Sequence, residues 1–163
     1  FFFQADAGIR DCLLSRGLGD VYKRQGLIMA SRSKKTEVVP RTQVLLGDTI
    51  GELNFLYSLS DIAFIGGSLI DHGGQNLLEP SAQHLPLLSG PSLRNFYDIS
   101  KQLIEKDGLE IIYNSDDLSD KFIQYIKNSA DLRRRGDAAF EVFMSNRGAL
   151  NIILDHLQEP LNS

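Results

Sequence analysis

Two glycine pairs lie close together in the stretch FIGGSLIDHGGQNLLEP, which runs from residue 64 to residue 80. The first pair follows an apolar run and precedes Ser68, and the second precedes a short segment with helical character. Glycine adopts positive φ and has no Cβ, so it lets backbone N–H groups come close to a ligand. Unpaired N–H groups at the start of a helix favour a negatively charged ligand. The pattern therefore predicts an anion site, most simply for a phosphate group.

Three polar side chains follow the second glycine pair. Gln75 and Asn76 provide hydrogen-bond donors, and Glu79 lies three residues after Asn76, so both can face one ligand if the turn is helical. A carboxylate repels phosphate, but its two oxygens accept hydrogen bonds from a pair of sugar hydroxyls. These features indicate a nucleotide site formed by Gly66, Gly67, Ser68, Gly73, Gly74, Gln75, Asn76 and Glu79. The structural alternative is that the glycines form tight turns and that Glu79 is a first-turn helix acid.

The sequence gives little support to other kinds of site. The glycine spacing matches neither G-x-G-x-x-G nor G-x-x-x-x-G-K-[ST], which argues against the dinucleotide and P-loop classes. His72, His84 and His156 lack i,i+4 partners and no cysteine cluster is present, so no metal site is expected. Ser68 has no histidine at a spacing that indicates a hydrolytic nucleophile. The net charge of −4 gives no general attraction to nucleic acid, and we expect no nucleic-acid partner.

Short apolar runs alternate with helical patterns along most of the chain. The apolar runs predict strands within residues 43–47, 61–67, 86–90 and 109–113. The helical patterns cover residues 48–61, 75–85, 95–108 and 114–128, and a last helical stretch over 130–158 is expected to break near Gly148. The alternation predicts an α/β fold, a Rossmann-like parallel sheet with helices on both faces. Ligands bind such sheets at the carboxyl ends of the strands, where both glycine pairs fall.

Local signals predict where several helices begin and end. Thr49 and Glu52 fit a capping box for the first helix. Asn95 is the expected N-cap of the third helix, and Gly108 its C′ residue. Pro80 is tolerated only in a first turn, so the second helix is expected to begin within residues 76–79. Helical spacing predicts three inward faces: Ile50, Leu53, Leu56, Tyr57 and Leu59; Ile99, Leu103 and Ile104; and Leu118, Phe122, Tyr125 and Ile126.

The first 25 residues differ from the rest of the chain. They show no clean helical or strand period, and they are similar to the translated adapter sequence found at the ends of some reading frames. We therefore expect residues 1–25 to be an irregular, non-native segment. Residues 26–163 are expected to form one nucleotide-sugar (donor) binding domain that includes the C-terminal helices. No run of about 18 apolar residues is present, so no membrane span is expected.

Five motifs together resemble the C-terminal domain of 3-deoxy-D-manno-octulosonic acid (Kdo) transferases: LGDTIGEL, FIGGSL, GGQNLLEP, GP...NF and NRGAL. The resemblance runs from about residue 26 to residue 157. It implies the C-terminal half of a GT-B fold, in which two Rossmann-like domains face each other and this one binds the donor CMP-Kdo. It also implies that residues 66–68 line the donor cleft, that residues 73–76 meet the phosphate and sugar, and that Glu79 meets the ribose hydroxyls. The family often has glycine in place of His84 and histidine in place of Ser92.

The resemblance also implies an activity for the full-length protein. Such an enzyme would transfer Kdo from CMP-Kdo to the lipid A precursor in lipopolysaccharide biosynthesis, at the cytoplasmic face of the bacterial inner membrane. No redox cofactor or metal is implied. The general base, the acceptor site and the membrane-anchoring segment belong to an N-terminal half that this sequence does not include. We therefore expect no catalytic residue here and no activity of this chain alone. Two alternatives stay open: a GT-B domain that uses a UDP-sugar, and a non-catalytic nucleotide-binding module.

Overall fold

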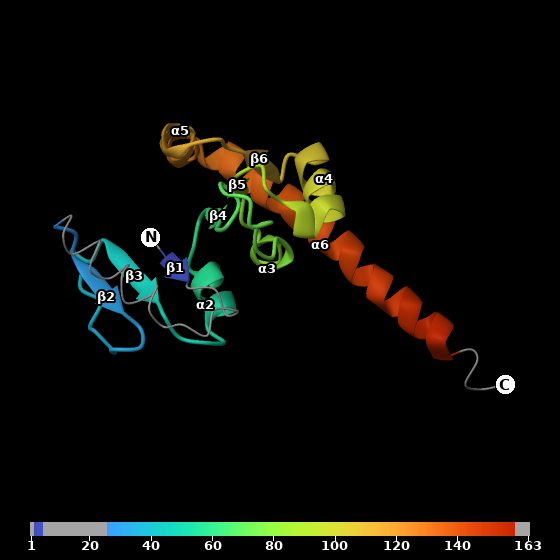
Figure 1. Cartoon of the computed structure of the whole chain (residues 1–163), viewed down its shortest axis with the longest axis horizontal. Helices are drawn as coiled ribbons and strands as arrows, with labels where there is room; N and C mark the ends of the chain where they lie inside the picture. Colours follow the sequence, from blue (N-terminus) through green and yellow to red (C-terminus); the bar gives the residue numbers. More distant parts are fainter. Residues whose placement is uncertain (1, 5–25, 159–163) are drawn as a thin grey trace. The chain divides into compact units, whose positions relative to one another are not determined.

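The computed structural model describes the backbone of residues 2–4 and 26–158 and the side chains of residues 26–147. The chain forms two compact units, the first ending at Leu56 and the second beginning at Tyr57. Each unit contains a three-stranded parallel sheet, with the strand orders β1-β3-β2 and β4-β5-β6 (Figure 1). The predicted α/β class with parallel strands is confirmed, but the strands form two small sheets where one continuous sheet was expected.

The first unit is built on β3, the middle strand of its sheet. β3 (Val44–Gly47) matches the predicted strand and pairs with β2 (Met29–Ser31) and β1 (Phe2–Gln4). The short strand β2 was not predicted, because its three residues give too little periodicity to recognise. β1 lies within the segment that was expected to be irregular. The other residues of that segment lie outside the described part of the chain.

The helix after β3 is shorter than the sequence suggested. α2 spans Leu53–Ser58, and Gly51 before it has a φ of 84°, which an α-helix cannot include. The predicted capping box is wrong, because the side chains of Thr49 and Glu52 bond to each other and Glu52 also binds a guanidinium. The predicted inward face is wrong at Ile50, which precedes the helix and is 93% exposed, and at Leu59, which follows the helix and is 56% exposed.

The second unit has a sheet with helices on both faces (Figure 1). Its strands are β4 (Ala63–Ile65), β5 (Leu87–Ser89) and β6 (Leu109–Ile111), each inside a predicted strand. Leu87 and Leu88 point to opposite faces of the central strand, and both are fully buried. Leu87 belongs to the larger core with residues of α4 (Tyr97–Glu105) and α6 (Ser129–Gln158). Leu88 packs with Tyr125 of α5 (Ser115–Lys127), so the two-faced arrangement is confirmed for this unit.

The two ends of α4 differ from their predicted caps. A short 3-10 helix, η1 (Arg94–Phe96), precedes α4, and Asn95 lies inside it instead of capping the helix. At the other end, Asp107 adopts the left-handed φ of 64°, and the N–H of Gly108 donates to the Leu103 carbonyl at 2.8 Å. Gly108 is therefore one position beyond the predicted site. A Cβ there would lie 2.8 Å from the backbone nitrogen of Ala139, so this glycine permits close helix packing.

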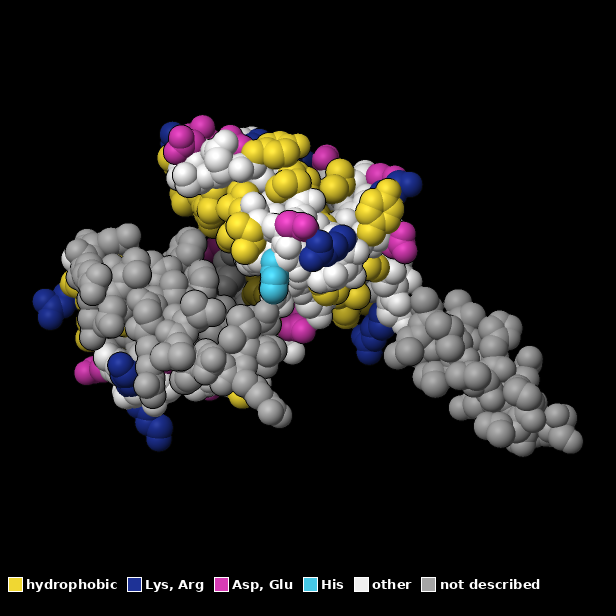
Figure 2. Space-filling view, in the orientation of Figure 1, with side chains coloured by type: hydrophobic (Ala, Val, Ile, Leu, Met, Phe, Trp, Pro, Cys, Tyr) yellow, Lys and Arg dark blue, Asp and Glu magenta, His cyan; other side chains and the backbone are white. Residues whose placement is uncertain are grey.

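The last two helices are more regular than expected. Asn114 caps α5 by accepting hydrogen bonds from the N–H groups of residues 116 and 117. Ile126, placed on the inward face by its spacing, is 74% exposed, and Figure 2 shows other hydrophobic side chains at the surface of this unit.

α6 continues through Gly148 without the predicted break, because one glycine costs a helix only about 1 kcal/mol. In the described part of the chain, no helix has the length and apolarity needed to cross a bilayer.

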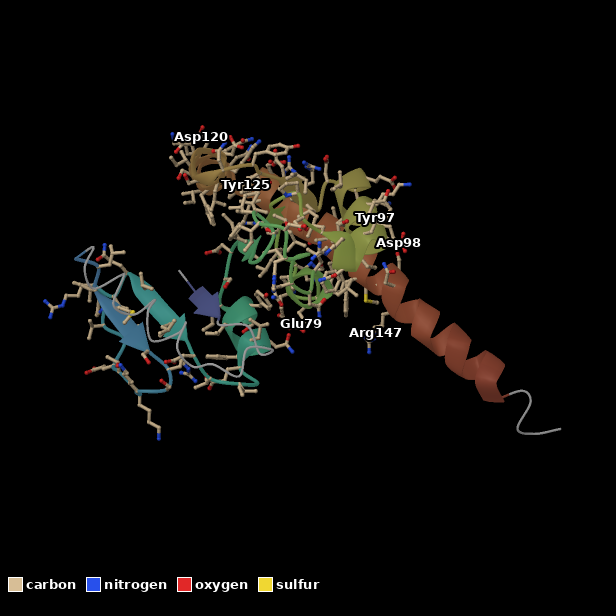
Figure 3. All side chains as sticks on the ribbon, in the orientation of Figure 1. Glu79, Tyr97, Asp98, Asp120, Tyr125 and Arg147 are labelled. Carbon is tan, nitrogen blue, oxygen red and sulfur yellow. The ribbon has the colours of Figure 1, made fainter. Side chains whose placement is uncertain are left out.

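A polar cluster centred on Glu110 connects β6 to the two last helices. The Tyr125 hydroxyl donates to Glu110 Oε2 at 2.8 Å, Lys121 forms an ion pair with Oε1, and Arg135 Nη1 lies 3.6 Å from Oε2. Tyr125 is labelled in Figure 3. Burial opposes ionisation of Glu110, but the hydrogen bonds from Lys121 and Tyr125 and the charges of Lys121 and Arg135 outweigh it. The pKa of Glu110 is therefore lowered.

We expect Glu110→Gln to destabilise the protein by about 1–2 kcal/mol at pH 7, because it removes the charge from these hydrogen bonds. The pKa of Glu110 is lower in the folded than in the unfolded state. Its stabilising effect is therefore complete above the unfolded value of about 4.3 and is lost as the pH falls through the folded value. Urea unfolding at pH 7 and pH 3 should show the difference between the variant and the wild type shrinking at pH 3. Glu105→Gln, on the exposed side of α4, is the matched control and should change little at either pH.

Candidate functional site

The loops that follow β4 and β5 are joined through Ser68. Its hydroxyl donates to the Ile65 carbonyl at 2.5 Å and accepts from the Gly90 N–H at 2.8 Å. Its carbonyl accepts from the Ser92 N–H at 3.0 Å. Ser68 has no exposed surface. The predicted position at the carboxyl end of a strand is correct, but the side chain of Ser68 is used inside the fold and is not presented to a ligand.

The second glycine pair is packed against the loop after β5. Gly73 and Gly74 are buried and have φ values of 92° and 72°, which favour glycine. The Gly73 N–H donates to Ser92 Oγ at 3.0 Å, and the Gly74 N–H donates to the Gly67 carbonyl at 3.3 Å. A Cβ on Gly74 would lie 2.8 Å from Leu93 Cδ2 and 3.1 Å from the Ser92 carbonyl oxygen. The chain's own packing therefore explains this pair, as in the structural alternative.

Gly66 differs from the other glycines of the stretch. It is exposed, its φ lies outside the left-handed region, and a Cβ at this position would meet no atom within 4 Å. The fold itself does not require glycine here. The adjacent Gly67 does adopt a left-handed φ of 67°, and its carbonyl holds Gly74. Gly66 thus leaves open backbone at the carboxyl end of β4, which a ligand can approach.

Asn76 and Glu79 lie together as their spacing predicted. The Asn76 amide donates to Glu79 Oε1 at 2.9 Å, while Asn76 Oδ1 accepts from the Leu78 N–H at 2.9 Å. Glu79 is half-buried in the first turn of α3 (Leu78–Ser81) and is labelled in Figure 3. Burial, together with the negative charge of Glu79, raises the pKa of Tyr57 to about 12. The hydrogen bond from the Asn76 amide fixes Oε1 of Glu79, and Oε2 remains for another hydrogen bond.

The helix that carries Glu79 is shorter than predicted. α3 contains only one turn, within the range of residues 75–85 expected to be helical, and Pro80 occupies its first turn as predicted. The macrodipole grows with aligned peptide units, so one turn contributes little positive potential. Gln75 precedes this turn and is exposed. Any attraction for an anion must therefore come from individual N–H groups and amide side chains and not from a long helix.

The sequence analysis did not predict an ion pair that holds the loop between the two glycine pairs. It joins Asp71 of that loop to Arg94 of η1. Arg94 Nη1 donates to Asp71 Oδ1 at 2.6 Å, and Arg94 Nη2 lies 3.4 Å from the Asp71 carbonyl oxygen. Ser92 Oγ is also within 3.5 Å of Asp71 Oδ1. The one hint in the sequence was the presence of polar residues, Ser92 and Arg94, just after the predicted strand at 86–90. Their partners are about twenty positions away in the sequence, and periodicity does not reveal such pairing.

The histidines do not gather into a metal site among the described residues. No group of three or more His, Cys, Asp or Glu side chains arranged to hold a metal ion is found there. His84, where glycine is frequent in the resembled family, has a left-handed φ of 55°. Its ring stacks on Phe140 with centroids 3.8 Å apart, and its Nδ1 lies 2.9 Å from Asp137 Oδ1. The contacts with Phe140 and Asp137 hold the His84 side chain at this left-handed position. The side chain of His156 lies outside the described residues.

Several curated relatives of the chain carry the same name. No protein-family model matches the chain. It is 40% identical over 145 residues to the 3-deoxy-D-manno-octulosonic acid transferase of Haemophilus influenzae, covering 88% of this chain and 34% of that protein. It is 34% identical over 137 residues to the protein of the same name from Bordetella pertussis, covering 83% of this chain and 32% of that protein. The chain thus spans about a third of the length of these relatives.

A solved structure is also similar. It is the crystal structure of the C-terminal CMP-Kdo binding domain of WaaA from Acinetobacter baumannii. The TM-score is 0.75 at 29% sequence identity, and the match covers 78% of this chain and 67% of that one. The likeness in fold and sequence therefore extends over most of the chain.

Two glycines at neighbouring strand ends offer a matched test of these contacts. A Cβ on Gly90 would lie 2.3 Å from the carbonyl oxygen of Ser68, which is backbone and cannot move away easily. We expect Gly90→Ala to destabilise the protein by about 1–3 kcal/mol through overpacking. Gly66→Ala meets open space at an ordinary φ and should change the free energy of unfolding by less than about 0.5 kcal/mol. Urea unfolding of both variants measures the two free energies of unfolding. Equal losses of stability would contradict the conclusion that Gly90 is closely packed and Gly66 is not.

Proposed function

The chain is a homologue of the Kdo transferases and corresponds to their C-terminal part, and we propose that it forms the donor-binding part of such an enzyme. The full-length enzyme would transfer Kdo from CMP-Kdo to a hydroxyl of the lipid A precursor. It would act at the cytoplasmic face of the inner membrane, with the acceptor bound by another part of the protein. The observations that carry the site are the open backbone at Gly66 and the oriented Asn76–Glu79 pair.

Glu79 suits the ribose of the donor. Its Oε1 already accepts from the Asn76 amide, so the carboxylate is held in one orientation. Two vicinal hydroxyls can donate to carboxylate oxygens, whereas a phosphate would be repelled. The hydrogen bond between Gly74 and Gly67 brings the two ends of the glycine loop together. In the proposal, Glu79 therefore binds the ribose, and the backbone at residues 66 and 67 lies close to the phosphate.

The proposed contribution of this chain to the reaction is binding and charge stabilisation. The acceptor oxygen forms a bond to the anomeric carbon of Kdo while the bond from that carbon to the CMP phosphate oxygen breaks. Negative charge then grows on the departing phosphate. The backbone N–H groups at residues 66 and 67 and the side chains of Gln75 and Asn76 would stabilise this charge. No residue of this chain is proposed to remove the proton from the acceptor hydroxyl.

A binding experiment tests the ribose contact. We expect Glu79→Gln to weaken binding of CMP to this chain about tenfold, because a charge-assisted hydrogen bond is lost. The same substitution should have a much smaller effect on 2′-deoxy-CMP, which lacks one of the two hydroxyls. Titration followed by NMR gives the affinity and the shifted residues. Glu105→Gln is the control, since Glu105 lies on the exposed side of α4.

Three outcomes would oppose this proposal. If CMP at millimolar concentration shifts no signal between residues 66 and 79, the site is assigned wrongly. If Glu79→Gln weakens CMP and 2′-deoxy-CMP equally, Glu79 does not bind the 2′-hydroxyl of the ribose. If UMP or UDP binds more tightly than CMP, the chain belongs with a UDP-sugar donor, and equal binding of AMP would favour a general nucleotide-binding module.

We also expect Gly66→Ala to weaken CMP binding while leaving the stability unchanged. The added methyl group meets no atom of the protein, so only a ligand that approaches the backbone would encounter it. NMR titration of the folded variant measures this effect. An unchanged affinity would show that the donor does not approach residue 66.

A further inference from the structure

A hollow of about 520 Å³ lies in the first unit, at the carboxyl ends of β2 and β3. Its volume falls within the range of roughly 300–1,000 Å³ that is usual for small-molecule sites. The residues used below come from the segment after β2 and from β3 and its following loop: Arg32, Lys35, Thr36, Val38, Leu45 and Glu52. The hollow includes none of the residues proposed for the donor. Ligands of parallel sheets bind at this edge, so the hollow is placed where a site is expected.

The segment after β2 is held in one conformation. The Lys35 N–H donates to the Arg32 carbonyl at 3.0 Å, and the Thr36 N–H donates to the Ser31 carbonyl at 3.1 Å. Asp48, which follows β3, accepts from the Ser33 N–H at 2.8 Å and from Ser31 Oγ at 3.0 Å. Lys35 has a left-handed φ of 49°. That conformation is uncommon for a residue with a long side chain and costs energy, so the surrounding contacts fix the backbone of Lys35 at the hollow.

The charges that line the hollow do not cancel. Arg32 Nε lies 3.0 Å from Glu52 Oε2, and Arg32 Nη2 lies 2.5 Å from Oε1. The hydrogen bonds from Arg32 and Thr49 lower the pKa of Glu52 to about 2, so this pair is fully ionised and neutral as a whole. Within the described residues Lys35 forms no salt bridge. Among the side chains that line the hollow, one positive charge is therefore left over, with the hydroxyl of Thr36 next to it in the chain.

The same hollow has an apolar side. Val38 is 60% exposed, and Leu45, on the central strand of this sheet, is half-buried. Apolar surface around a few placed polar groups is the usual composition of a small-molecule site. An inorganic ion would leave Val38 and Leu45 uncovered, and a neutral apolar molecule would leave Lys35 without a counter-charge. A ligand that uses both sides has an anionic group on a compact apolar body.

We propose that this hollow binds a small organic anion. Its anionic group contacts Lys35 and Thr36, and its apolar body covers Val38 and Leu45. Phosphate monoesters and carboxylates share this chemistry, so both must be tried. The hollow is lined by none of the residues of the proposed donor site, so we expect its occupancy not to depend on Glu79.

Phenyl phosphate, benzoate and inorganic phosphate are suitable probes, titrated into the whole chain and followed by NMR. We expect phenyl phosphate or benzoate to shift the signals of residues 31–36 and to bind more tightly than inorganic phosphate. The tighter of the two organic probes identifies the anionic group. Lys35→Gln should weaken that probe about tenfold, as expected for the loss of a charged hydrogen-bond donor. Glu79→Gln should leave its affinity unchanged.

Lys34→Gln is the matched control, because it removes the same charge from the neighbouring residue, which does not line the hollow. Its effect should stay below about twofold, as for an exposed charge. Equal losses in the two lysine variants would show diffuse electrostatic attraction and overturn the proposal. Equal affinity for inorganic phosphate would exclude a role for the apolar side, and absence of any shift at residues 31–36 would exclude binding. Circular dichroism confirms that each variant is folded.

Discussion

A single buried hydroxyl group joins the loop that carries the proposed donor site to the loop that follows β5. Ser68 Oγ bonds the end of β4 on one side and the backbone after β5 on the other. Strand pairing fixes β4 and β5 next to each other, but it ends before the loops begin. The side chain of Ser68 connects the two chain segments just beyond their last paired residues. Further along the same two loops, Ser92 bonds to Gly73 and Arg94 bonds to Asp71, as expected if Ser68 holds the loops together where they begin.

The strands of the second unit could be predicted from the sequence, and several helix boundaries could not. Continuous apolar runs such as the one around Leu87 and Leu88 have a simple physical cause, because both faces of a central strand are buried. Helix ends depend on competing partners. Glu52 was expected to cap α2, yet Arg32, twenty residues earlier, binds its carboxylate. Gly148 was expected to interrupt α6, but its small intrinsic cost does not break a long helix.

The glycines near the proposed site show a second limit of sequence analysis. Their position at a strand end followed from the alternation of strands and helices. The reason for each glycine did not, because the same residue serves a tight turn, a close packing contact or a ligand. Gly74 is explained by its left-handed φ and by Leu93, whereas Gly66 has neither constraint. Only the surroundings in three dimensions separate the two cases, and they leave Gly66 as the position with room for a ligand.

The contact between Ser68 and Gly90 also has a consequence for how this fold can diverge. The hydroxyl of Ser68 needs the N–H of Gly90, and the carbonyl of Ser68 leaves no room for a Cβ at position 90. A change at either position alone removes a buried hydrogen bond or creates a clash with backbone. Positions 68 and 90 should therefore each be conserved among related proteins, because both constraints act through backbone groups and a change at one position does not relieve the other.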